Sequence, residues 1–95
     1  MSERVMLMVY CYDVAQDRTR ARVAHLLEDH AVRVQDSVFE MRLTQAAANR
    51  LYRAIVRLLD DGDMLRMYAI GAAAFPRCQS YGGSPIAGDT ASWIV

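Results

Sequence analysis

The feature that most constrains this chain is an unbroken apolar run near its N-terminus, Val5-Met-Leu-Met-Val-Tyr-Cys-Tyr12, which Asp13 ends. A run this short, rich in β-forming residues and without alternation, indicates a buried central strand. It is far shorter than the roughly 20 residues that a membrane-spanning helix needs. The acidic and basic residues that follow it do not fit a signal-peptide cleavage site. The run therefore predicts the middle of a sheet, and we expect a cytoplasmic protein.

Two helices are expected after this strand. Asp17 can cap a helix that starts at Arg18 and ends near His30, and Thr44 can cap a second helix that runs to about Leu59. On the first helix, the face expected to pack on the core holds Thr19, Val23, Leu26, Leu27 and His30. On the second, the expected core stripe is Ala48, Leu51, Ile55, Leu58 and Leu59.

The segment from Arg33 to Leu43 is expected to form one long second strand. Its polar and apolar residues change phase part of the way along, which indicates a bulge or a strand that serves two surfaces. Phe39 is expected in the core. A turn at Asp60-Asp61-Gly62-Asp63 then leads into a third strand, Met64 to Ile70.

A chain of 95 residues predicts a single domain, with its core at 4–70, a loop-rich segment at 71–89 and a terminal strand at 90–95. The terminal Trp93-Ile94-Val95 is apolar, so we expect it to dock on its own sheet or on a partner's. The order of the elements fits an α+β fold, a ferredoxin-like β-α-β-β-α-β sandwich.

The net charge says little about function, whereas the choice of basic residue is more informative. The formal net charge is zero, so bulk charge gives no argument for nucleic-acid binding. All 11 positive residues are arginine, which reflects either a compositional bias or a need for bidentate contacts to phosphate or carboxylate. The two cysteines, Cys11 and Cys78, lack zinc-binding spacing.

Asp13 is the strongest candidate for chemistry because a carboxylate at the end of a buried strand must be solvated, hydrogen-bonded or neutralised. It is either a loop carboxylate that accepts backbone hydrogen bonds or a ligand for Mg²⁺ or Mn²⁺. Magnesium often takes one or two protein carboxylates and keeps several waters. One Asp per chain is a poor site, but two copies of Asp13 facing each other across a dimer axis would form a plausible one. Asp17 is the weaker candidate.

An arginine cluster follows at Arg18, Arg20 and Arg22. Arg18 and Arg22 share a helix face with His25 one turn further, whereas Arg20 lies at the flank. These cations form either a solvated face paired with acidic neighbours or an edge that binds phosphates. Further along, Arg33, Gln35 and Ser37 form a polar triplet able to contact a backbone edge, a partner chain or phosphates.

Other common chemistries lack support in the sequence. There is no Ser-His-Asp or Cys-His spacing for covalent catalysis, and no glycine-rich phosphate loop. Nucleotide binding and nucleophilic catalysis by a side chain are therefore not expected.

Several of these motifs together resemble a known family. They are Tyr12-Asp13-Val14, Arg18-x-Arg20-x-Arg22-Val23-Ala24, Leu26-Leu27, Arg33-Val-Gln-x-Ser37-Val-Phe-Glu40, Leu43-Thr44 and Arg66-Met67-Tyr68. The chain is similar in these motifs to the CRISPR-associated protein two family, the small partner of the CRISPR integrase in spacer acquisition. The match extends over about residues 5–70 and is weak beyond Ile70. Ala31 departs from the glycine that many members carry before the second strand, so this turn must avoid a positive φ or tolerate strain.

The resemblance implies a ferredoxin-like homodimer whose final strands contribute to the partner's sheet. It implies that Asp13 from both protomers holds a divalent metal, Mg²⁺ or Mn²⁺, for endonuclease activity on RNA or duplex DNA. It also implies a scaffold that bridges integrase dimers and holds double-stranded DNA by its backbone, without reading sequence. The residues assigned to DNA are Arg18, Arg20, Arg22 and Arg33, and those assigned to the dimer interface are Gln35, Ser37, Trp93 and Ile94. Outside the family, the alternative is a small ferredoxin-like ribonuclease, toxin-like or regulatory module.

Overall fold

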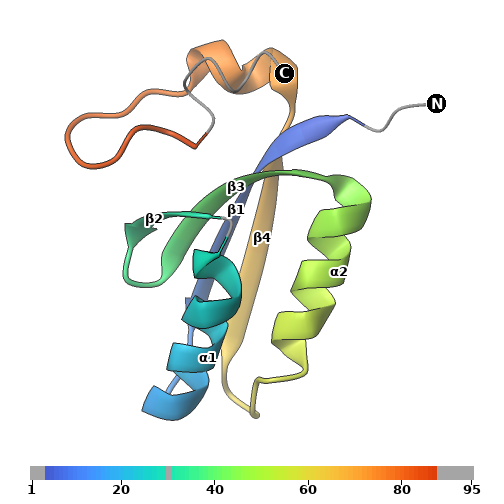
Figure 1. The fold of residues 1–95 in the computed structure, drawn as a ribbon, viewed down its shortest axis with the longest axis vertical. Helices are drawn as coiled ribbons and strands as arrows, with labels where there is room; N and C mark the ends of the chain where they lie inside the picture. Colours follow the sequence, from blue (N-terminus) through green and yellow to red (C-terminus); the bar gives the residue numbers. More distant parts are fainter. Residues whose placement is uncertain (1–3, 30, 88–95) are drawn as a thin grey trace.

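The computed structural model describes residues 4–29 and 31–87 and forms one antiparallel sheet with two helices on one of its faces (Figure 1). The strand order is β2-β3-β1-β4, so each helix connects two strands that have another strand between them. This is the ferredoxin-like α+β arrangement that the sequence predicts. The elements are β1 (Val5–Asp13), α1 (Asp17–Glu28), β2 (Val32–Gln35), β3 (Val38–Thr44), α2 (Gln45–Val56), β4 (Met64–Ile70) and the 3₁₀ helix η1 (Ala72–Arg77).

The apolar run near the N-terminus forms β1, the strand with a neighbour on each side. Met8, for example, lies opposite Met41 of β3 and Ala69 of β4. Met8 and Tyr10 are completely buried, because the helices cover one face of β1 and other strands cover both of its edges. The prediction of a central strand is confirmed.

The expected long strand from Arg33 to Leu43 is wrong: it is a hairpin of β2 and β3 that turns at residues 36–37. The change of phase has two causes, the turn itself and a shift of register in β2 between Arg33 and Gln35. The backbone N–H of Tyr12 donates to the carbonyl of Ser37 at 3.2 Å, and its hydroxyl donates to the carbonyl of Asp36 at 3.1 Å. The turn is therefore fastened to the end of β1.

Helix α1 begins one residue earlier than expected, and Asp17 does not cap it. The N-cap is Gln16, whose side chain makes no capping hydrogen bond, and Asp17 lies in the first turn. There the carboxylate pairs with Arg20 instead and sits favourably at the positive end of the helix dipole.

The buried stripe of α1 also differs from the expected one. Thr19, Val23, Ala24 and Leu27 are buried, whereas Leu26 is exposed on the outer face. The successive 100° steps of the helix place Leu26 beyond the edge of the stripe that points at the sheet. His30 lies outside the described residues.

Helix α2 has the cap that the sequence predicts. The hydroxyl oxygen of Thr44 accepts a hydrogen bond from the backbone N–H of Ala47 at 3.2 Å. The helix ends at Val56, three residues before the expected Leu59. Its core residues Ala48 and Ile55 are fully buried. The remaining residues of the expected stripe, Leu51, Leu58 and Leu59, are partly buried against the core.

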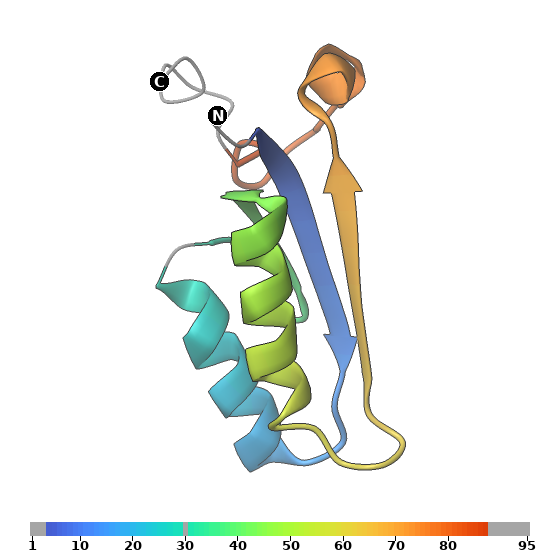
Figure 2. The ribbon, with the colours of Figure 1, turned by 90° about the vertical axis from the view of Figure 1, so that its right-hand side faces the viewer.

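The two faces of the sheet differ sharply. Figure 2 shows both helices on the same side, over the face that holds Met8, Tyr10, Phe39 and Met41. On this side the hydroxyl of Tyr10 donates to the carbonyl of Ala48 in α2 at 2.8 Å. The opposite face, over most of its area, is left without a helix by the described part of the chain.

Part of that opposite face is covered by the segment after β4. Residues 72–77, expected as loop, form the 3₁₀ helix η1. Beyond it, the segment up to Ala87 folds back towards the sheet, where the carboxylate of Glu40 accepts a hydrogen bond from the N–H of Ala87 at 3.0 Å. Leu7 of the sheet and residues of this segment line a cavity of about 550 Å³. The expected strand at 90–95 lies outside the described residues.

Within the described ranges, none of the helices combines the length and apolar character needed to cross a bilayer.

Candidate nucleic-acid interface and metal site

Asp13 is the last residue of β1 and is exposed to solvent, opposite Met64 of β4. In the described part of the chain, no three His, Cys, Asp or Glu side chains gather into a group that could hold a metal ion. A single exposed carboxylate can serve as one of the few protein ligands of Mg²⁺. Among the described residues of one chain, Asp13 could thus supply one carboxylate ligand to a divalent ion, and the remaining ligands would have to come from water, a substrate phosphate or another chain.

The loop that follows Asp13 is held by side chains from two other elements. Asp63, just before β4, accepts a hydrogen bond from the N–H of Ala15 at 3.2 Å. Arg20 of α1 donates to the carbonyl of Val14 at 2.9 Å. Asp13 is thus followed by a loop with a defined position between α1 and β4.

The outer face of α1 carries the cations that remain available. Arg18 and Arg22 are exposed and lie one turn apart, and within the described residues neither makes a hydrogen bond or an ion pair. Together with His25 they border a shallow groove of about 640 Å³ that also includes Ala21, Leu26 and Leu58. The two guanidinium groups can therefore reach an external anion without first breaking an internal contact.

The two other candidate arginines are already engaged. Arg20 pairs with Asp17 in addition to its bond to the loop. Arg33 lies 3.3 Å from a carboxylate oxygen of Glu28, donates to the carbonyl of Asp36 at 3.3 Å, and lies 5.0 Å from the ring centre of Phe39. The four arginines expected to act together thus fall into two pairs, one free to bind a ligand and one that braces the fold.

Tyr12 connects Arg33 to the end of β1. Burial raises the pKa of the Tyr12 hydroxyl, and the hydrogen bond and charge of Arg33 oppose this rise. The hydroxyl therefore stays protonated around neutral pH and keeps its bond to the Asp36 carbonyl.

Of the expected interface residues, Gln35 and Ser37 lie in the described part of the chain. Gln35 is at the end of β2, one edge of the sheet, and Ser37 is in the turn that contacts Tyr12. Trp93 and Ile94 lie outside the described residues.

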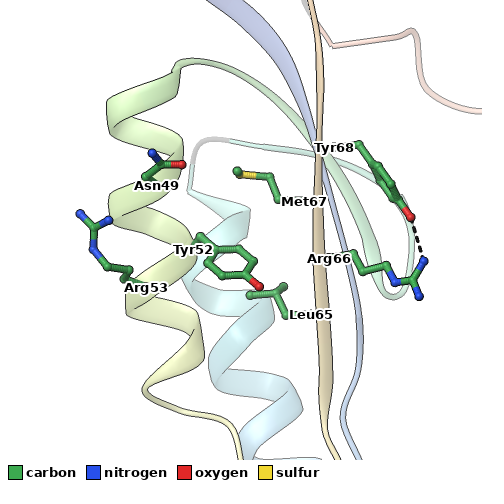
Figure 3. Close-up of a pocket in the computed structure, with 7 residues that line it drawn as sticks. All are labelled: Asn49, Tyr52, Arg53, Leu65, Arg66, Met67 and Tyr68. Carbon is green, nitrogen blue, oxygen red and sulfur yellow. Dashed lines mark hydrogen bonds between the residues drawn. The ribbon is translucent and has the colours of Figure 1, made fainter.

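A groove along β4 was not foreseen from the sequence. Of the described strands β4 is at the edge of the sheet, so one side of its backbone has no strand partner. Figure 3 shows Leu65 and Met67 pointing towards α2, and Arg66 and Tyr68 on the opposite side of the strand. Arg66 donates to the hydroxyl of Tyr68 at 3.1 Å. Asn49, Tyr52 and Arg53 of α2 complete the lining of a cavity of about 540 Å³.

Such a groove suits an extended peptide, because a strand edge offers backbone hydrogen bonds and side-chain pockets on alternating sides. The only sequence signal for it is Tyr68, an aromatic residue on the face of β4 that the helices leave open. The residues of β4 alone do not indicate an edge strand, since that depends on the strand order of the whole fold.

The architecture defines a small ferredoxin-like α+β protein with one covered and one open sheet face. The family model for "CRISPR associated protein Cas2" matches residues 6–78, and the chain belongs to this family. The resemblance seen in the motifs is thereby confirmed.

Individual relatives agree with this assignment. The "CRISPR-associated endoribonuclease Cas2 3" of Synechocystis sp. is 33% identical over 92 residues, which cover 96% of this chain and 100% of the relative. The crystal structure of Streptococcus pyogenes Cas2 superposes with a TM-score of 0.67 at 29% identity, covering 81% of this chain and 100% of that one. A chain of a partial Cas6-RT-Cas1–Cas2 complex gives a TM-score of 0.66 at 29% identity, covering 85% and 90%.

Proposed function

We propose that this protein is a dimeric scaffold of CRISPR spacer acquisition that binds the backbone of duplex DNA and bridges dimers of the integrase. The observation that carries the proposal is the pair of exposed arginines, Arg18 and Arg22, on the outer face of α1. Family membership adds to it, since a structural neighbour is a chain of a complex that contains Cas1 and Cas2. Family membership also favours this interpretation over an unrelated regulatory or toxin-like module.

Arg18 and Arg22 are better suited to DNA than the other two candidates. Guanidinium groups bind phosphate in a bidentate manner, and backbone contacts fix the position of a duplex without reading its sequence. Arg20 and Arg33 would have to leave their partners in the chain before they could do the same. Their contribution to DNA affinity should therefore be the smaller one.

The salt dependence of duplex binding tests this assignment. Each lost phosphate contact should reduce the slope of log K against log salt by roughly 0.9. We expect this reduction for Arg18→Ala and for Arg22→Ala, measured by fluorescence anisotropy from low to moderate salt. Arg50→Ala, which removes an exposed arginine of α2, is the matched control. Slopes equal to that of the control in both variants would contradict the proposal.

The dimer is proposed to form through the open face of the sheet and the edge of β4. The terminal strand of one protomer, with Trp93 and Ile94, would pair with β4 of the other, and Gln35 and Ser37 would contact the partner from the other end of the sheet. The groove beside β4 supports this because it has the shape and the unpaired backbone that strand addition requires.

Deletion of residues 90–95 tests the dimer. The truncated chain should sediment as a monomer at concentrations where the full chain is dimeric. Replacing Ser80 and Ser84 in the preceding segment by Ala is the control, since these residues are exposed and should leave the dimer intact. A truncated chain that remains a tight dimer would rule out an essential exchange of the tail.

A second activity, endonuclease, is favoured by Asp13 and by the printed names of relatives as endoribonucleases. In this proposal the Asp13 carboxylates of two protomers hold Mg²⁺ or Mn²⁺ at the dimer axis. The bound ion would supply Lewis-acid activation of water and of the scissile phosphate. Asp13 itself acts as a ligand rather than as a base.

Asp13→Asn separates the two activities. Cleavage of single-stranded RNA and of duplex DNA should be lost in this variant, while spacer acquisition in cells should persist. Asp61→Asn, an exposed acid in the turn before β4, is the control. Cleavage at the wild-type rate by Asp13→Asn would overturn the nuclease proposal and leave the scaffold proposal standing.

A further inference from the structure

The loop between Asp13 and α1 is held from two sides by residues for which no role was expected there. Both carboxylate oxygens of Asp63 are used: one accepts from the N–H of Ala15 at 3.2 Å and the other from the N–H of Asp60 at 2.9 Å. On the other side, Arg20 donates to the carbonyl of Val14 at 2.9 Å. In the loop, a carboxylate thus holds the N–H of Ala15 and a guanidinium group holds the carbonyl of Val14.

The position of Asp63 in the sheet explains why these contacts matter. Asp63 immediately precedes Met64, and Met64 is the register partner of Asp13. The hydrogen bond from Ala15 to Asp63 therefore ties the loop after β1 to the residue that precedes β4. Any displacement of the loop has to break this bond or move the end of β4.

The carboxylates of Asp63 and Asp13 differ in their hydrogen bonding. Both carboxylate oxygens of Asp63 accept from backbone N–H groups, so these two bonds fix the orientation of its side chain. Asp13 is exposed, and in the described residues no hydrogen bond to its side chain is formed. Asp63 thus holds the loop in place, whereas the side chain of Asp13, just before the loop, is exposed to solvent.

We propose that Asp63 and Arg20 are positioning residues that fix the loop so that Asp13 and the first turn of α1 face the same ligand. The ligand is the nucleic-acid backbone, contacted through a divalent ion at Asp13 and directly by Arg18. The inference rests on the proposed function for the identity of this ligand. It reassigns Arg20 from a phosphate contact to a brace for the loop.

The test uses Asp63→Ala, which loses both bonds, and Asp63→Asn, whose single carbonyl oxygen can keep one of them. Asp61→Asn is the control. In hydrogen-exchange experiments on the full-length protein, the amide of Ala15 should exchange roughly ten-fold faster in Asp63→Ala. The increase should be smaller in Asp63→Asn, and the core amide of Tyr10 should not change.

A second readout distinguishes positioning from simple stabilisation. In wild type, Mn²⁺ should broaden the amide resonance of Asp13, and the midpoint of this titration should rise several-fold in Asp63→Ala. Duplex DNA should bind several-fold more weakly to Asp63→Ala and to Arg20→Ala, with the wild-type salt slope, because Arg18 and Arg22 remain. A slope lowered by roughly 0.9 in Arg20→Ala would instead make Arg20 a phosphate contact and overturn its part of the proposal.

Two results for Asp63→Ala would overturn the proposed role of Asp63. Unchanged exchange at Ala15 in Asp63→Ala would overturn the brace, and faster exchange with wild-type affinity for both Mn²⁺ and DNA would overturn the positioning role. If Mn²⁺ leaves Asp13 unaffected in wild type, the metal part of the proposed function fails. In that case the DNA affinity of Asp63→Ala alone decides the positioning role, so the two failures remain distinguishable.

Discussion

The two faces of the sheet are made from the same strands but differ in how far their side chains are buried. Towards the helices, Met8, Tyr10 and Phe39 are fully buried. On the other face Tyr68 is 50% exposed, although it lies directly opposite Val9 of the central strand. Adjacent residues of one strand therefore experience either a packed interior or solvent, according to the side on which they lie.

The described core therefore lies on one side of the sheet, and the dimer proposed above would use the other side. The covered face follows the usual behaviour of a domain core, in which lost volume is costly. The open face carries Tyr68, a half-exposed aromatic residue.

The largest effect is expected for Phe39→Ala on the covered face. Removing a fully buried ring should lower the free energy of unfolding by about 3–5 kcal/mol, from lost burial and the cavity left behind. Tyr68→Ala on the open face should change it by only about 0.5 kcal/mol. Urea denaturation at protein concentrations where sedimentation shows a monomer measures both. Similar losses in the two variants would remove the distinction.

Alkaline pH should act on the covered face through Tyr10. Burial raises the pKa of Tyr10 from 10.0 to about 12. A raised pKa means that the stabilisation is complete below pH ~10 and is lost as the pH rises through ~12, because the unfolded chain releases the proton first. The loss attributable to Tyr10 should be roughly 3 kcal/mol.

The control for this prediction is Tyr10→Phe, which should lack that part of the decline between pH ~10 and ~12. Tyr81→Phe, which changes a fully exposed tyrosine, should decline as wild type does. Thermal denaturation at intervals across this range is the measurement. Parallel curves for wild type and Tyr10→Phe would show that Tyr10 is not protected from titration by the helices.

On the open face the expected effect is on association. Tyr68→Asp should raise the dissociation constant of the proposed dimer at least ~10-fold, about 1.4 kcal/mol, because an unpaired charge would be buried in the proposed interface. Arg50→Asp on α2 should leave the constant near the wild-type value. Sedimentation equilibrium measures both, and an unchanged constant in Tyr68→Asp would place the interface elsewhere.

The smallest change in stability is expected at the N-terminal cap of α2. Thr44→Ala removes the cap of α2 and should lower the free energy of unfolding by about 1 kcal/mol. Thr44→Ser keeps a hydroxyl oxygen at the same position and should restore most of the loss. Chemical denaturation checks the pair, and equal stability of the two variants would mean that the cap contributes nothing.

Much of the fold could be predicted because its signals are local. The apolar run of β1, the cap at Thr44 and the turn at residues 60–63 each follow from neighbouring residues in the sequence. The turn between β2 and β3 was missed although Asp36 and Ser37 are both turn-forming residues, because the pair lacks the glycine that most strongly marks a two-residue hairpin. Tyr12 supplies part of what holds that turn, from 24 residues away.

The candidate site could be predicted only in part. Asp13 was expected at the end of β1 and is found there, since the end of an apolar run is visible in the sequence. The contact of Asp63 with Ala15 depends on β4 lying beside β1, which no local pattern encodes. The separation of the four arginines into a free and an engaged pair likewise depends on which acids and carbonyls the fold brings near them.

The edge of β4 would make a monomeric chain prone to aggregation. The strand Met64–Ile70 is apolar apart from Arg66 and contains no proline, which are the properties of a segment prone to intermolecular pairing. A dissociated chain would expose this template to any extended polypeptide in a concentrated solution. In the proposed dimer this edge would be covered, so solubility during expression should depend on how quickly newly made chains associate, and a charged residue at Ala69 would be the simplest protection against aggregation.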